Sequence, residues 1–110
     1  MNYWRYKYDS SYYLFNVCKS GNKAATKFLL EQGVNINMKD TKDETPLFTA
    51  CKNGNKFLVK YLGEKGADIN KKSFYNETPL FLSCENGNED LMKYLIDHIT
   101  DMDKVINKKY

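Results

Sequence analysis

Apolar residues recur along the chain at the spacing of short amphipathic helices. Within residues 47–62 they fall three or four positions apart in two runs, which Asn53-Gly54 separates. Thr45-Pro46 precedes the first run, and a threonine N-cap followed by proline at the first helical position favours a helix start. A glycine follows the second run and marks its end. The pattern predicts two short helices joined by a turn.

The same pattern occurs three times at an interval of 33 residues. Thr45-Pro46-Leu47-Phe48 returns as Thr78-Pro79-Leu80-Phe81, and the Leu-Phe pair also stands at Leu14-Phe15. Three cysteines and three Gly-Asn pairs keep the interval: Cys18, Cys51, Cys84, Gly21-Asn22, Gly54-Asn55 and Gly87-Asn88. One helix pair is too small to bury its own apolar face, so stacked neighbours must share a core. The sequence therefore predicts an all-α solenoid of three stacked helix-turn-helix units.

The interval divides the chain into an aromatic amino-terminal segment and three units. Their expected bounds are 1–11, 12–44, 45–77 and 78–110. The last unit is lengthened, because Ile106-Asn107 lies 37 residues beyond Ile69-Asn70. We expect the four extra residues to follow the last helix.

The second unit resembles the ankyrin repeat in two segments, Thr45-Pro46-Leu47-Phe48-Thr49-Ala50-Cys51-Lys52-Asn53-Gly54-Asn55 and Gly66-Ala67-Asp68-Ile69-Asn70. Two units match in full, and residues 12–44 form a degenerate amino-terminal cap. The resemblance implies a solenoid with projecting loops that binds other proteins. Phenylalanine replaces the usual histidine after Thr-Pro-Leu, at Phe15, Phe48 and Phe81. Asp43 and Asn76 replace the turn glycine of the loops, and both residue types tolerate positive φ better than most.

The resemblance also implies where a partner protein would bind. The candidate loop positions are Thr41, Lys42, Glu44, Phe74, Tyr75 and Glu77, and the candidate first-helix positions are Asn16, Lys19, Ser20, Thr49, Lys52, Asn53, Leu82, Glu85 and Asn86. Phe74 and Tyr75 stand out because large aromatic residues at an exposed tip are enriched among interface anchors. The alternative is that they fold back onto a neighbouring loop.

The carboxyl end suggests a second kind of contact. Residues 104–110 resemble the start of a fourth repeat, so the third unit is expected to leave an apolar flank uncovered. Either the chain is a fragment of a longer array, or the flank associates with a partner or with another copy. Head-to-tail self-association is favoured by a basic segment at 1–27 and an acidic one at 78–103.

Composition argues against nucleic acid and membrane as partners. The chain has 17 Lys and Arg residues against 14 Asp and Glu, a net charge of +3 that is too small to indicate a nucleic-acid surface by itself. The aromatic segment with Tyr3, Trp4, Tyr6 and Tyr8 is expected to cap the first unit rather than bind single strands. No stretch approaches the roughly 20 apolar residues of a membrane span, and no secretory signal is recognisable. We therefore expect a cytoplasmic or nuclear protein.

No arrangement of residues indicates catalysis, a metal or a cofactor. The three cysteines are expected to be buried packing residues, because each falls at a small-residue position of a first helix. His98, the one histidine, is expected at the end of the last helix and lacks companions at metal-ligand or catalytic spacing. The sequence predicts an interaction module rather than an enzyme.

Overall fold

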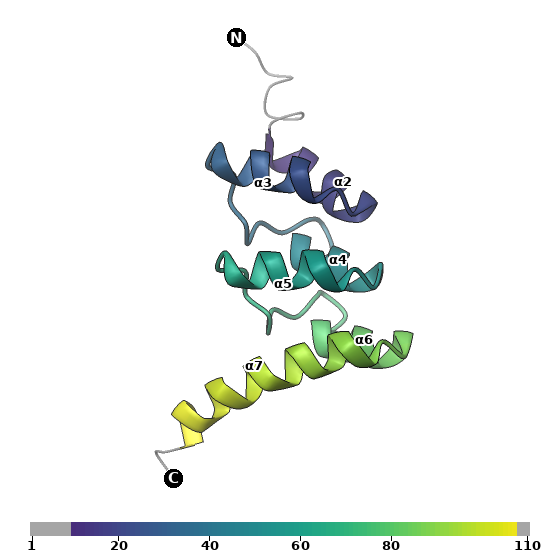
Figure 1. The fold of residues 1–110 in the computed structure, drawn as a ribbon, viewed down its shortest axis with the longest axis vertical. Coiled ribbons are helices and arrows are strands. Elements are labelled where there is room, and N and C mark those ends of the chain that lie inside the picture. Colours follow the sequence, from purple (N-terminus) through teal and green to yellow (C-terminus); the bar gives the residue numbers. More distant parts are fainter. Residues whose placement is uncertain (1–9, 108–110) are drawn as a thin grey trace.

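The computed structural model describes residues 10–107, and describes side chains over residues 12–99. This part of the chain is helical, without strands, so the all-α prediction is confirmed. The helices are α2 (Ser10–Ser20), α3 (Lys23–Glu31), α4 (Pro46–Lys52), α5 (Lys56–Glu64), α6 (Pro79–Asn86) and α7 (Glu89–Asn107). Figure 1 shows three helix pairs stacked one on another, with α7 running out beyond the stack.

Capping residues explain where the helices begin. The Thr45 hydroxyl accepts a hydrogen bond from the Phe48 amide at 3.2 Å, and Thr78 does the same for Phe81 at 3.2 Å. Each threonine is followed by proline at the start of its helix. At the second helices an asparagine serves as the cap, as when the Asn55 side chain accepts from the Leu58 amide at 3.0 Å. The Thr-Pro starts agree with the sequence pattern, whereas the asparagine caps were not among the predictions.

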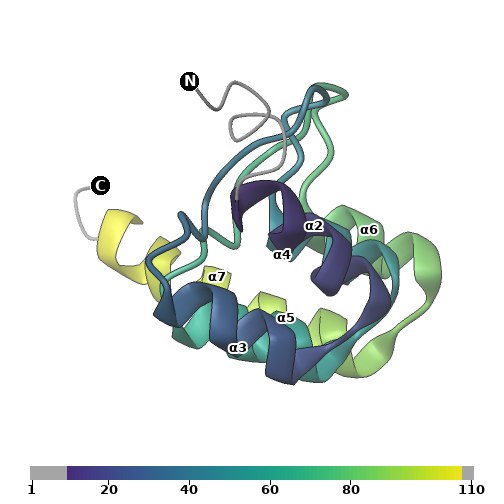
Figure 2. The same ribbon diagram turned by 90° about the horizontal axis from the view of Figure 1, so that it is seen from above.

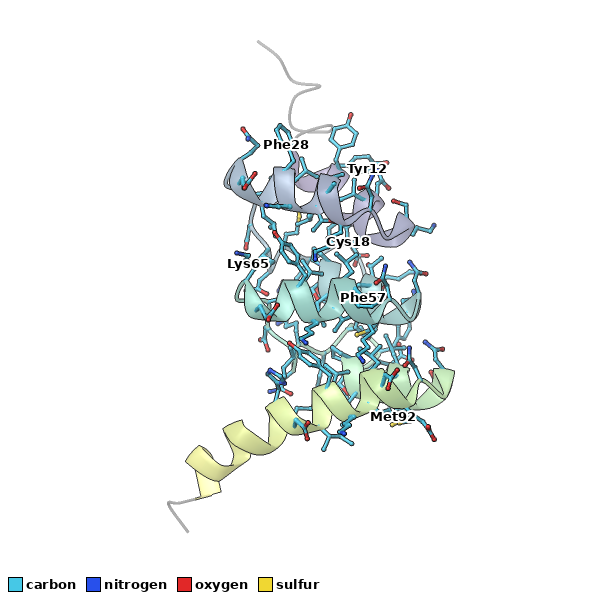
Figure 3. The ribbon with its side chains drawn as sticks, in the orientation of Figure 1. Tyr12, Cys18, Phe28, Phe57, Lys65 and Met92 are labelled. Atoms are coloured by element: carbon cyan, nitrogen blue, oxygen red, sulfur yellow. The ribbon has the colours of Figure 1, made fainter. Side chains whose placement is uncertain are left out.

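The core lies between the two rows of helices and continues through the stack. Its fully buried members come from all three pairs and include Leu14, Cys18, Leu47, Cys51, Leu58, Val59, Leu62, Leu91 and Leu95. Because these residues repeat at equivalent positions, each pair covers the apolar face of the next. Figure 3 shows the side chains filling the space between successive pairs.

Asparagine amides join each pair to the one before it. Asn53 Nδ2 donates to the Lys19 carbonyl at 2.6 Å, Asn86 Nδ2 to the Cys51 carbonyl at 3.2 Å, and Asn88 Nδ2 to the Gly54 carbonyl at 3.1 Å. These bonds bring side-chain donors to carbonyl groups in the last turn of the first helices and in the turn that follows α4. The stack is therefore fixed by polar contacts as well as by apolar packing.

The extra residues of the third unit lengthen its second helix, so the expectation that they follow the last helix is wrong. Helix α7 spans 19 residues, against nine each for α3 and α5. The shorter helices end just before Gly33 and Gly66, which adopt φ angles of 90° and 101°, whereas Ile99 stands at the equivalent position of α7. Without the glycine the helix continues. His98 consequently lies inside α7 and not at its end.

Equivalent side chains differ in exposure at the two ends of the stack. Phe28 is 59% exposed at the amino-terminal end, where Figure 3 shows it with Tyr12. At the other end Phe81 is 47% exposed, although its equivalent Phe48 is 1% exposed, and Cys84 is exposed, although Cys18 and Cys51 are buried. The expectation that all three cysteines are buried is therefore wrong for Cys84, because no further helix pair covers α6 in the described part of the chain.

No helix within the described residues is both long and apolar enough to cross a membrane. The residues proposed to form an aromatic cap, Tyr3 to Tyr8, lie outside this part of the chain.

Candidate functional site

Two loops of the same conformation project from the stack, one between α3 and α4 and one between α5 and α6 (Figure 2). In the first, the Asp40 amide donates to the Glu44 carbonyl at 3.0 Å, and in the second the Ser73 amide donates to the Glu77 carbonyl at 2.9 Å. Each loop turns through one non-glycine residue of positive φ, Asp43 at 58° and Asn76 at 62°. The predicted tolerance of these two residues for that geometry is confirmed.

A polar side chain at the start of each loop holds the turn. The Asp40 carboxylate accepts from the Lys42 and Glu44 amides at 2.8 and 2.9 Å, and the Ser73 hydroxyl accepts from the Tyr75 and Glu77 amides at 3.2 and 3.3 Å. We did not identify Asp40 and Ser73 as loop-forming residues from the sequence. Their 33-residue separation, together with the known preference of Asp and Ser for such turns, was the available signal.

The two loops are joined through their backbones near the tips. The Phe74 amide donates to the Lys42 carbonyl at 2.7 Å, and at the base of the loops the Asn37 side chain accepts from the Asp68 amide at 2.8 Å. The tips thus form a continuous ledge on the side of the first helices, as the view from above shows (Figure 2). Binding to this ledge would require little ordering of the loops.

Phe74 and Tyr75 lie together at the tip of the second loop. Their rings are in edge contact, with centroids 5.6 Å apart and planes at 79°. They remain 72% and 64% exposed, so neither side chain is buried against the neighbouring loop. The corresponding positions of the first loop hold Thr41 and Lys42, both exposed. The ledge therefore has an aromatic end and a polar end.

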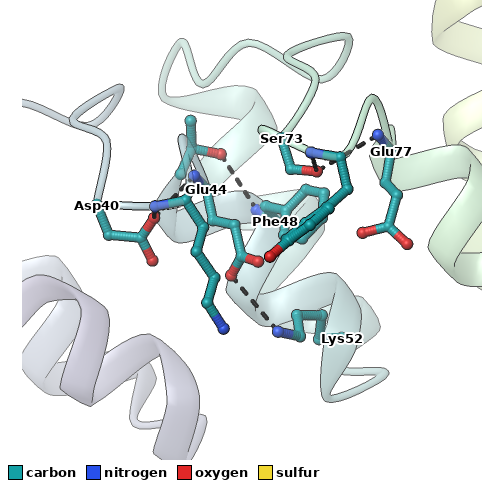
Figure 4. A network of polar contacts seen from close by, with 9 residues as sticks. Asp40, Glu44, Phe48, Lys52, Ser73 and Glu77 are labelled. Carbon is teal, nitrogen blue, oxygen red and sulfur yellow. Dashed lines mark hydrogen bonds and ion pairs between the residues drawn. The ribbon is translucent and has the colours of Figure 1, made fainter.

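Glu44 was expected at the exposed partner-binding surface, but it is buried. It is 7% exposed, and its carboxylate lies 3.4 Å from the Lys52 ammonium group (Figure 4). The Lys52 side chain is 48% exposed, so this pair lies at the edge of the surface. Pairing across a loop and the following helix explains why a charged residue is buried here. The Glu44 carboxylate is thus paired with Lys52 and largely withdrawn from the surface.

The first-helix candidates divide into free and occupied side chains. Leu82 is 8% exposed and belongs to the core, which corrects its expected place on the binding face. The amides of Asn53 and Asn86 are occupied in the inter-repeat bonds, and the Ser20 hydroxyl donates to the Val17 carbonyl at 3.1 Å. Thr49 is half-buried. Asn16, Lys19 and Glu85 are exposed, as Lys52 is in part.

The buried cysteines and the one histidine lie apart in the described part of the stack, on α2, α4 and α7. Burial raises the pKa of the Cys18 thiol to about 11 and that of Cys51 to about 12, which keeps both protonated and unreactive. His98 Nδ1 lies 2.9 Å from the Tyr94 carbonyl oxygen of its own helix. Among the side chains that the structure describes, no group of three or more potential metal ligands occurs.

Helix pairs stacked at a 33-residue interval, capped by Thr-Pro and carrying projecting loops, define a repeat protein of the ankyrin type. The chain matches the family model for ankyrin repeats in three copies over residues 14–108. It belongs to the ankyrin repeat family. A search among curated proteins gave no match. Ankyrin repeats are generally protein-protein interaction modules and are typically not enzymatic.

Proposed function

We propose that this protein binds a partner protein through the ledge of loop tips and the adjoining exposed face of the first helices, with Phe74 and Tyr75 as the anchors. The observation that carries the proposal is the exposed aromatic pair on a hydrogen-bonded loop. Large apolar side chains fixed at a tip contribute buried area at little entropic cost. The exposed neighbours Thr41, Lys42, Lys19 and Lys52 form a more polar rim.

The outer helices offer a useful contrast. Phe57 on α5 is 77% exposed, more than either loop aromatic, but it stands alone, with Lys56 and Lys60 on the same helix. Phe57 lies on α5 (Figure 3), and Figure 2 shows this helix on the side of the stack opposite the projecting loops. Single exposed apolar residues are common on protein surfaces and carry little information. Phe57 therefore provides a matched control for the loop pair.

The proposal can be tested with peptides selected by display against the full chain. Peptides that bind the wild type would be measured by calorimetry against Phe74→Ala/Tyr75→Ala and against Phe57→Ala. We expect the double variant to bind at least tenfold more weakly, because interface anchors typically contribute about 2 kcal/mol or more each. Phe57→Ala should bind as the wild type does.

Both variants should keep their helices, because none of the three residues is buried. Circular dichroism would check this. Equal affinity of the double variant and the wild type would remove Phe74 and Tyr75 from the site.

We also propose self-association as a second function, carried by a different surface. The carboxyl-terminal flank exposes Phe81 and Cys84 at positions that are buried in the preceding pair. Contact with another copy would cover them as α6 covers α4. Light scattering over a wide concentration range would test this, with Phe81→Glu as the disrupting variant. A mass that stays monomeric at all concentrations would contradict it.

A further inference from the structure

We propose that the partner segment bound at the aromatic pair presents a basic side chain, an arginine or lysine, which lies between Glu77 and Glu85. The inference rests on the proposed function, because it concerns the same surface and names the chemistry of what binds there. It follows from comparing equivalent positions at the two junctions between successive units.

Where the first unit meets the second, a glutamate at the end of the loop pairs with a lysine on the following helix. The Glu44 carboxylate and the Lys52 ammonium group are 3.4 Å apart. One repeat later, where the second unit meets the third, Glu77 stands at the position of Glu44, but Glu85 stands at the position of Lys52. The cation of the second unit is thus replaced by a second carboxylate.

The backbone supports the same relative placement at both junctions. The loop closures are alike, at 3.0 Å for Asp40 to Glu44 and 2.9 Å for Ser73 to Glu77, and the threonine caps that follow have equal lengths of 3.2 Å. Figure 4 shows the Glu44 and Glu77 side chains extending in the same direction from successive loops. Glu85 is therefore placed to share with Glu77 a cation such as the one that Lys52 supplies to Glu44.

No cation of the described residues forms an ion pair with either carboxylate. The nearby Lys52 is bound to Glu44, and the other ion pair in this part of the chain joins Lys56 to Asp90 on the outer helices. Glu77 is half-buried and Glu85 is exposed. Two like charges on one edge of the surface repel each other unless a partner neutralises them.

Glu77 lies in the same loop as Phe74 and Tyr75, two residues after Tyr75, which makes the fit specific. A guanidinium group can donate hydrogen bonds to two carboxylates while it stacks on an aromatic ring, and an ammonium group can donate to both and make a weaker cation–π contact. At the other end of the same face, Lys19 is exposed and positive. The face therefore changes from positive to negative toward the third unit, which favours a partner segment with its basic side chain at that end.

The experiment uses the peptides selected against the full chain. We expect an arginine or lysine beside an apolar residue to recur among them, and Glu77→Gln/Glu85→Gln to weaken their binding about tenfold. The matched control is Glu31→Gln/Asp97→Asn, which makes the same change of charge at exposed positions of α3 and α7 and should bind as the wild type does.

A charge exchange makes the test independent of folding effects. A peptide in which the basic residue is changed to glutamate should lose binding to the wild type and regain it with Glu77→Lys/Glu85→Lys. Peptides that need Phe74 and Tyr75 but carry no basic residue, or that show no recovery in the exchange, would overturn the inference and leave the proposed function standing. Peptides that bind independently of Phe74 and Tyr75, or a selection that yields none, would count against both.

Discussion

At the residue scale, Gly63 and Tyr94 form a contact that depends on the absence of a side chain. A Cβ atom at Gly63 would lie 2.5 Å from the Tyr94 hydroxyl oxygen but 3.5 Å from the ring carbon that carries it. The hydroxyl is buried without a hydrogen-bond partner among the described residues. Burial, with a smaller effect of the negative charge on Glu64, raises the pKa of Tyr94 above its usual value. Tyr94 therefore fits α5 closely but carries an unsatisfied polar group.

Gly63→Ala is expected to have opposite effects in two backgrounds. In the wild type it should destabilise the fold by about 1 kcal/mol or more, because the new methyl group meets the hydroxyl. In Tyr94→Phe it should stabilise the fold by up to about 1 kcal/mol, because alanine is the better helix former and the ring carbon is at ordinary contact distance. Tyr94→Phe alone should be neutral or stabilising, since it removes an unpaired buried group. Urea unfolding of the four proteins measures this, and equal effects in both backgrounds would contradict the contact.

The buried thiol of Cys51 predicts a loss of stability at alkaline pH. Burial raises its pKa from 9.0 to about 12, so in this range the unfolded chain ionises while the folded chain holds its proton. The contribution of Cys51 is complete below about pH 9 and is lost as pH rises toward 12, by at most about 1.4 kcal/mol per pH unit. The free energies of unfolding of the wild type and of Cys51→Ala, measured between pH 8 and 11, should become more alike as pH rises. A difference that stays constant with pH would show that the thiol does not titrate in this way.

At the scale of elements, a first helix contributes more to stability when the next helix pair packs on it than when that side is left exposed. Phe48 and Phe81 occupy equivalent positions of α4 and α6. Helix α6 covers Phe48, whereas no helix of the described chain covers Phe81. Burial of the same side chain should therefore contribute very different free energies in the two units.

We expect Phe48→Ala to cost about 3 to 5 kcal/mol and Phe81→Ala less than about 1.5 kcal/mol. Chemical unfolding at a protein concentration where the chain is monomeric would measure both. Similar losses would mean that Phe81 is covered in solution, and a dependence of its loss on concentration would indicate that another copy covers it.

The sequence predicted those features of the elements that depend on local chemistry. The threonine caps, the Thr-Pro starts and the positive φ of Asp43 and Asn76 follow from residue type and neighbours along the chain. The length of α7 was mispredicted: the four extra residues were expected after the last helix, but Ile99 stands where Gly33 and Gly66 stop the shorter helices, and α7 continues through them. Glycine at this position favours the end of a helix, and Ile99 does not, so α7 continues to Asn107.

The candidate site was less predictable, because exposure depends on contacts between units. Leu82 follows the periodicity of the exposed face, but it is buried in the stack. Glu44 is buried because a lysine eight positions away pairs with it. Neither effect can be deduced from spacing alone, whereas the exposure of Phe74 and Tyr75 follows from their position at a turn held by Ser73.

At the scale of the whole molecule, the stack presents three distinct surfaces. The ledge of loop tips carries the aromatic pair, the outer helices carry mixed charges with Phe57, and the carboxyl-terminal flank carries Phe81 and Cys84. Because the loops are bonded to one another and the helix pairs are joined through asparagine amides, partner binding to the ledge should require little rearrangement. The surface that a partner covers therefore decides whether the ledge is the binding site.

Chemical-shift mapping by NMR tests this most directly. The isotopically labelled chain would be titrated with a peptide selected for binding to the wild type. The account predicts the largest amide shifts at residues 40–44 and 73–77 and along the exposed face of α4 and α6, with little change in α3 and α5. Shifts confined to the outer helices or to the carboxyl-terminal flank, with residues 74 and 75 unaffected, would contradict it.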